Sequence, residues 1–166
     1  MIFMKNSTTN LKNLNSELKY ALSGFLIIMS LGIFTGLLYI NHTTDMSVFG
    51  TLEQYTGSEV EEYDIPEKFP KEYESMLLIS HQHIVSFAFI SFVLGAIFNF
   101  NTIINQKLKK FLIIEPYISI FITFSSMWLM RYFNSNFVYL LIISSTLMYL
   151  CWYVMILVSL YDLNRK

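Results

Sequence analysis

The sequence has 166 residues, of which 54% are hydrophobic and 14% are charged. Soluble domains carry about 25% charged residues, so this chain lacks the polar surface that a soluble domain needs. A formal net charge of −1 argues against the strongly basic faces of nucleic-acid-binding proteins. Four long apolar runs instead predict an all-α protein, a four-helix transmembrane bundle.

The chain begins with a polar segment, residues 1–19, followed by the first apolar run, residues 20–40. The polar segment has no short apolar stretch with a small-residue cleavage site, so we expect a cytoplasmic tail rather than a signal peptide. The run 20–40 carries no charge and is long enough to span a bilayer as a helix. Gly32 and Gly36 share one face of that helix, which favours close packing within the bundle or, alternatively, an oligomer contact.

Residues 41–71 are predicted to form one acidic loop outside the membrane. Acidic residues far outnumber lysines there, and Gly57, Pro66 and Pro70 interrupt any regular element. We expect this loop to be solvated and unstructured, and its charge suits a metal ion or a basic partner protein. Pro70 is expected to be the first residue of the next helix.

The remaining spans are predicted at about 72–99, 111–132 and 137–161, with residues 162–166 as a second tail. The lone Cys151 is expected to be a small core residue. Trp128 is expected to form part of an aromatic belt at the membrane interface.

Glu115 and Pro116 stand near the start of the third span and allow two interpretations. Either Pro116 begins the helix and the residues before it lie along the interface, or the helix continues through the proline with a kink. Glu115 in turn is either held by a cap or by a charge pair with Lys109 or Lys110, or it takes part in a proton relay.

The basic residues predict the orientation. With four spans both tails lie on one side, and that side collects eight of the eleven basic residues: Lys5, Lys12, Lys19, Lys107, Lys109, Lys110, Arg165 and Lys166. The positive-inside rule then places the tails in the cytoplasm and the loop 41–71 in the periplasm, for a multi-pass protein of the bacterial inner membrane.

Three histidines fall on the predicted outer side. His42 follows the first run, while His81 and His83 lie in the first third of the second, His81 about 7 Å below the apolar boundary. Imidazole is a ligand for haem iron and for copper, and Arg131 at the same level could pair with a haem propionate. His42, His81, His83 and Arg131 are therefore the predicted site of haem b or copper.

Helix geometry restricts this site. His81 and His83 are two residues apart and about 200° apart around a helix, so one of them faces the bundle and could pair with His42. The sequence does not determine which of the two histidines faces the bundle. The alternatives are histidines that hydrogen-bond hydroxyls or carbonyls across helices, with no cofactor bound, or a proton or substrate pathway.

Short motifs between residues 36 and 100 resemble a known group of proteins. They are His42-Thr-Thr, Met46, Gly50-x-x-x-x-Tyr55-x-Gly57-Ser58-Glu59, Pro70 and His81-Gln-His83. The chain resembles small four-span bacterial inner-membrane proteins, some of which accompany clade II nitrous oxide reductases as accessory subunits. The resemblance implies a role beside a periplasmic copper enzyme or its electron supply.

Two functions follow from these patterns. The first is a membrane redox or metal-handling protein with haem b or copper at the outer leaflet. The second is a non-catalytic accessory or assembly subunit of a respiratory complex, which binds another membrane or periplasmic protein through the loop 41–71. Both are electron-transfer or accessory roles rather than enzymatic ones. A transporter or channel is disfavoured because the sequence lacks paired interrupted helices.

Overall fold

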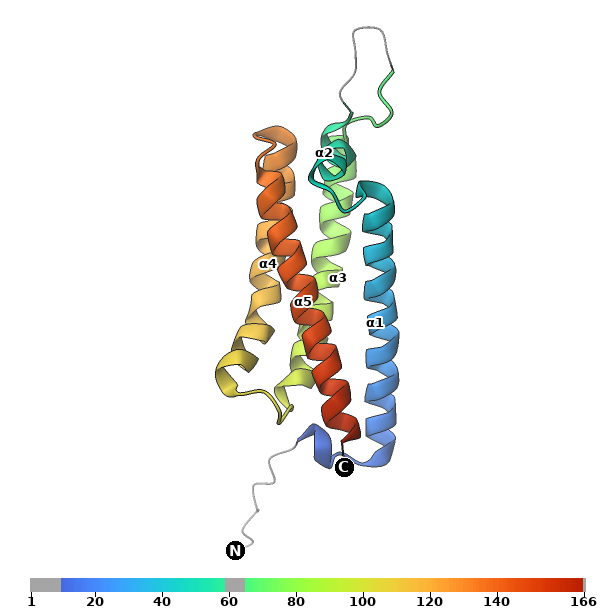
Figure 1. Ribbon diagram of the computed structural model, residues 1–166, viewed down its shortest axis with the longest axis vertical. Coiled ribbons are helices and arrows are strands. Elements are labelled where there is room, and N and C mark those ends of the chain that lie inside the picture. The colour runs from blue at the N-terminus through green and yellow to red at the C-terminus, as the bar shows by residue number, and fades with distance from the viewer. Residues whose placement is uncertain (1–9, 59–64, 166) are drawn as a thin grey trace, which may run out of the picture.

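The computed structural model describes residues 10–58 and 65–165, and every regular element among them is a helix. Four long helices run side by side, and one short helix covers an end of the bundle (Figure 1). The predicted all-α, four-helix transmembrane bundle is thereby confirmed. The elements are a 3-10 helix η1 (Leu11–Asn13) and the α-helices α1 (Ser16–Thr44), α2 (Val48–Thr56), α3 (Tyr73–Asn99), α4 (Gln106–Tyr132) and α5 (Phe137–Asn164).

The long helices extend beyond the apolar runs that predicted them. They have 27 to 29 residues, which gives a length of about 40 Å, whereas the hydrocarbon core is about 30 Å thick. Their ends therefore project into the interfaces. The largest difference at a single helix end is at α4, which begins at Gln106 rather than at residue 111.

Asparagine side chains cap two of these helices. The Oδ1 atom of Asn15 accepts a hydrogen bond of 3.1 Å from the backbone N–H of Leu18, and Asn105 does the same for Leu108 at 3.0 Å. Both caps lie at one end of the bundle, together with η1 and the last turn of α5 (Figure 1). We call this the terminal end and the opposite one, where α2 lies, the α2 end.

Part of the segment predicted as an unstructured loop is helix α2. The hydroxyl of Ser47 caps it by accepting a hydrogen bond of 2.9 Å from the N–H of Gly50. A Cβ atom at Gly50 would collide with the carbonyl oxygen of Thr44, so α2 lies directly against the end of α1. It also packs on α4 and α5. Residues 59–64, which carry four of the acidic groups of the predicted loop, lie outside the described residues.

Residues 65–72 are fixed to α2 and α1 before α3 begins. The N–H of Lys71 donates to the carbonyl of Tyr55 at 3.0 Å, and the ammonium group of Lys68 donates to the carbonyl of Thr43 at 3.0 Å. The prediction that Pro70 is the first residue of the next helix is wrong, because α3 begins three residues later at Tyr73.

Helix α4 continues through Pro116, so the helix does not begin at the proline as in the first interpretation. Proline removes one backbone hydrogen bond from a helix and displaces the preceding turn. Towards the terminal end α4 (yellow) and α5 (red) diverge, whereas they lie close together near the turn that joins them (Figure 1).

Polar side chains join the helices inside the bundle. The indole N–H of Trp128 donates to the hydroxyl of Ser80 at 2.8 Å, which links α4 to α3. The hydroxyls of Thr123 and Ser144 are 2.7 Å apart and link α4 to α5. In a membrane such contacts substitute for the hydrophobic driving force that lipid does not provide.

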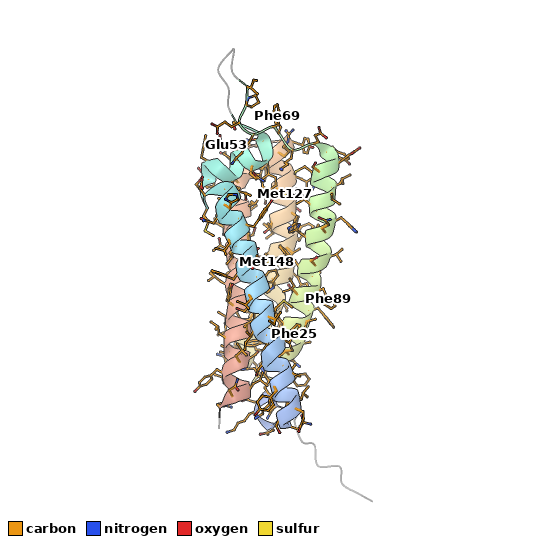
Figure 2. All side chains as sticks on the ribbon, turned by 90° about the vertical axis from the view of Figure 1, so that its right-hand side faces the viewer. Phe25, Glu53, Phe69, Phe89, Met127 and Met148 are labelled. Atoms are coloured by element: carbon orange, nitrogen blue, oxygen red, sulfur yellow. The ribbon has the colours of Figure 1, made fainter. Side chains whose placement is uncertain are left out.

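Apolar side chains divide between the core and the outer surface. Met127 and Met148 are buried among the helices, while Phe89 of α3 lies on the outside (Figure 2). An apolar outer surface is what a helix needs in contact with lipid.

A buried acidic side chain holds the terminal end together. Asp162 of α5 accepts a hydrogen bond of 2.7 Å from the N–H of Thr102 and forms an ion pair of 2.8 Å with Arg165. The turn between α3 and α4 is thereby fixed to the end of α5.

Candidate functional site: a groove between α4 and α5

The three predicted histidines lie on two helices. His42 is in the last turn of α1, His81 and His83 are in α3, and all three side chains are exposed on the protein surface. Within residues 10–58 and 65–165, no three His, Cys, Asp or Glu side chains are grouped closely enough to hold a metal ion. Binding of haem b or copper at these residues stays a prediction.

His83 is the member of the His81 and His83 pair that faces a neighbouring helix. Its ring centroid lies 5.4 Å from that of Phe87, in an edge-on arrangement, and 6.3 Å from that of Phe124 in α4. Its Nδ1–H donates to the carbonyl oxygen of Ile79 at 2.9 Å. This hydrogen bond leaves Nε2 as the ring nitrogen that is open to another partner.

Arg131 holds the chain at the α2 end. Its Nε–H donates to the carbonyl oxygen of Lys71 at 3.2 Å, and its guanidinium carbon lies 5.0 Å from the ring centroid of Tyr132. The ring of Tyr132 in turn stacks on Trp128 at 5.6 Å. The guanidinium group thus ties residues 65–72 to α4, and its predicted role as an anion partner stays untested.

A groove with a volume of about 560 Å³ lies between α4 and α5. Ligand pockets in proteins are commonly about 300–1,000 Å³, so this groove is large enough for a small molecule. It follows one face of α4 and the first half of α5. Its lining consists of Lys107, Lys110, Phe111, Ile114, Glu115, Ile118, Ser119, Ile122, Leu140, Ile143, Ser144 and Leu147.

Glu115 is the one acidic side chain that lines the groove, and it is 6% exposed. The hydroxyl of Ser119, one turn further along α4, donates to its Oε1 atom. Its Oε2 atom makes no hydrogen bond with any residue in the described part of the chain, although the Cys151 thiol of α5 lies beside the carboxyl group. Buried polar atoms in native proteins almost always have a partner, so an unpaired oxygen at this position needs an explanation.

The lysines near Glu115 lie apart from its carboxyl group, so the charge pair that was one predicted alternative does not form. The ammonium group of Lys109 is buried and donates to the carbonyls of Asn99 at 3.1 Å and Asn101 at 2.5 Å. Lys107 and Lys110 are exposed and line the terminal end of the groove. The groove is therefore cationic at this end and apolar along most of its length.

The sequence indicates Glu115 as a candidate residue but carries no signal for the groove around it. The spacing of Glu115 and Ser119, four residues apart on one helical face, is a visible signal for their contact. The divergence of α4 from α5 is not visible in a hydropathy pattern, because the pattern does not fix how two helices cross.

Comparisons with known proteins agree with the membrane assignment. A family model described as a transmembrane helical domain matches residues 45–166, which include α2 to α5 and the whole groove. No curated protein and no solved structure matches the chain. The family match, together with four apolar helices, identifies a multi-pass membrane protein from a small transmembrane family.

Proposed function

The chain belongs to the transmembrane helical domain family, and we propose that it is a binding protein which holds an amphiphilic molecule in the groove between α4 and α5. The observation that carries this proposal is the Oε2 atom of Glu115, buried at the groove and without a hydrogen-bond partner among the described residues. A bound molecule with one polar group would supply that partner. The apolar walls would hold its hydrocarbon portion.

The chemistry of the groove suits recognition. Ser119 fixes one oxygen of the carboxyl group, so that the other is held in one orientation. Such pre-orientation lowers the entropy lost on binding. Ile118, Ile122 and Leu147 line the groove beyond the carboxyl group and make its walls apolar there.

We place the groove in the inner leaflet of a bacterial inner membrane. This follows from the proposed orientation, in which the terminal end, with most of the basic residues, is cytoplasmic. The groove is lined by Lys107 in the first turn of α4 and so reaches that end. An amphiphile would then enter sideways from the lipid, with its polar group near the cytoplasmic interface.

Native mass spectrometry of the purified protein tests this function. Ile118→Trp fills the groove, and Leu157→Trp is the matched control, because Leu157 is an exposed apolar residue of α5 that does not line it. We expect the wild type and Leu157→Trp to retain an amphiphile of defined mass, and Ile118→Trp to retain at least about tenfold less. Equal retention by all three proteins, or no retention by the wild type, would overturn the proposal.

A second candidate function is the predicted haem b or copper site, and one observation at His83 favours it. Histidines that ligate metals typically donate the other ring N–H to a carbonyl or carboxylate, as Nδ1–H of His83 does to Ile79. This role suits the predicted place beside a periplasmic copper enzyme, which stays a prediction.

Visible absorption spectra with and without dithionite, together with copper analysis, test the second candidate. His83→Ala is expected to lose a bound cofactor, while His81→Ala, two residues away on another face of α3, is the control that keeps it. A wild-type protein with neither a Soret band nor stoichiometric copper would remove this candidate.

A further inference from the structure

We infer that the occupant of the groove is an anionic phospholipid whose phosphate lies at Lys107 and Lys110. This inference rests on the proposed amphiphile-binding function and names the class of ligand. It starts from the order in which polar and apolar groups follow one another along α4.

Charge complementarity identifies the headgroup. Lys107 and Lys110 are three residues apart on one face of α4, and both line the groove. Within the described residues neither forms an ion pair, since the ion pairs there join Lys68 to Glu53 and Arg165 to Asp162. Basic pockets between transmembrane helices on the cytoplasmic side bind anionic lipid headgroups.

The depth of Glu115 below the two lysines also matches a phospholipid. Glu115 follows Lys110 by five residues, which places it about 8 Å deeper along the helix. A phospholipid carries its ester groups just below the phosphate, which is the level of the Glu115 carboxyl. Ester oxygens only accept hydrogen bonds, so they would pair with the O–H of a carboxyl that carries its proton on Oε2.

The rest of the groove is suited to an acyl chain. Beyond Glu115 the walls are Ile118 and Ile122 on α4 and Ile143 and Leu147 on α5. From the terminal end inwards, the groove therefore presents cations, one carboxyl group and then hydrocarbon. A phospholipid presents phosphate, ester linkage and acyl chain in the same order.

Lipid titrations with defined headgroups test the inference. Delipidated full-length protein in detergent is titrated with phosphatidylglycerol or with phosphatidylcholine, and bound lipid is counted by native mass spectrometry. The test variant is Lys107→Gln/Lys110→Gln. The matched control is Lys12→Gln/Lys19→Gln, which removes the same charge from the same end of the bundle at residues that do not line the groove.

We expect the wild type to bind phosphatidylglycerol more tightly than phosphatidylcholine. Each lysine near a membrane surface contributes about fivefold to anionic lipid binding, so the double variant should lose about 25-fold for phosphatidylglycerol and little for phosphatidylcholine. The control variant should bind as the wild type does, and inorganic phosphate should not displace the lipid.

The outcomes separate this inference from the function on which it rests. Equal affinity for both lipids, no loss in the double variant, or displacement by phosphate alone would overturn the anionic-phospholipid inference. If Ile118→Trp still abolished binding in such a case, the amphiphile-binding function would stand. If Ile118→Trp left binding of both lipids unchanged, both would be wrong.

Discussion

The indole N–H of Trp152 in α5 donates a hydrogen bond of 3.0 Å to the hydroxyl of Ser91 in α3. Both residues lie in the centre of the bundle, where Trp152 is 1% exposed and Ser91 is 0% exposed. Phe87 packs edge-on against the indole ring at 5.1 Å. Because neither polar group can reach water at this depth, their bond fixes the position of α3 relative to α5.

Substitution of Ser91 by alanine should destabilise the protein. The change leaves the Trp152 N–H buried without a partner, and hydrogen bonds between membrane helices are worth about 0.6–1.7 kcal/mol. We expect the free energy of unfolding, measured by denaturant titration in micelles, to fall by about 1 kcal/mol. The matched control is Ser86→Ala, because the exposed hydroxyl of Ser86 bonds only to the carbonyl of Gln82 in its own helix. Equal effects of the two substitutions would contradict this account.

The conformation of Gly57 at the end of α2 supports a second prediction. Its φ angle is +87°, and a Cβ atom there would lie 2.7 Å from Cδ of Pro70. Backbone conformations of this kind cost about 1–3 kcal/mol for residues other than glycine. Gly57→Ala should therefore lower the thermal unfolding temperature and increase amide hydrogen exchange in α2.

Gly24→Ala provides the control for that experiment. A Cβ atom at Gly24 has no neighbour within 4 Å, and alanine is favoured over glycine in a helix by about 0.5–1 kcal/mol. This substitution should leave the unfolding temperature unchanged or raise it. If Gly57→Ala behaved in the same way, the contact between Gly57 and Pro70 would not constrain the α2 end.

The four spans could be predicted because hydropathy alone determines them. A run of about 20 apolar residues satisfies its backbone groups in lipid only as a helix, whatever its neighbours are. Helix α2 was missed for the opposite reason. Its nine residues are too few to form a stable helix alone, and α2 depends on its contacts with α1, α4 and α5.

The candidate site shows the same limit. The boundaries of the spans determine how deep a residue lies in the membrane, so the sequence predicts that the three histidines lie at a similar depth. It does not determine the direction of each side chain around its helix, which is why the choice between His81 and His83 stayed open. The position of Glu115 within a span makes it a candidate, but the groove depends on how α4 and α5 diverge towards the terminal end.

Tyr55 at the α2 end supports a prediction on alkaline pH. Burial, and to a smaller extent the nearby Tyr39, raises the pKa of Tyr55 above its ordinary value of 10.0. Above pH 10 the unfolded chain loses this proton while the folded chain retains it, so stability decreases as pH rises through that range. In Tyr55→Phe this loss should be smaller than in the wild type.

Unfolding free energies at pH 8 and above pH 10 measure the difference. The comparison with Tyr20→Phe, at an exposed position in α1, corrects for general effects of alkaline solution on the chain. A pH dependence that is identical in the wild type and Tyr55→Phe would show that the Tyr55 phenol does not contribute.

Glu115 should show opposite effects on stability and on binding. In the unliganded protein the Oε2 atom is a buried polar atom without a hydrogen-bond partner among the described residues, and such a group costs about 1–3 kcal/mol. Glu115→Leu removes that cost and fills the same space with an apolar side chain. We expect the variant to gain about 1–2 kcal/mol in unfolding free energy and to retain severalfold less amphiphile by native mass spectrometry.

Glu115→Gln is the matched variant, since it keeps the shape and the hydrogen-bonding capacity of the side chain. It should bind more amphiphile than Glu115→Leu and should gain less stability. If the carboxyl group of Glu115 served only to stabilise the fold, the result would differ. Glu115→Leu would then lower the free energy of unfolding, because the contact to Ser119 is lost. The combination of higher stability and weaker binding is therefore specific to a polar group that is retained in the membrane for a ligand.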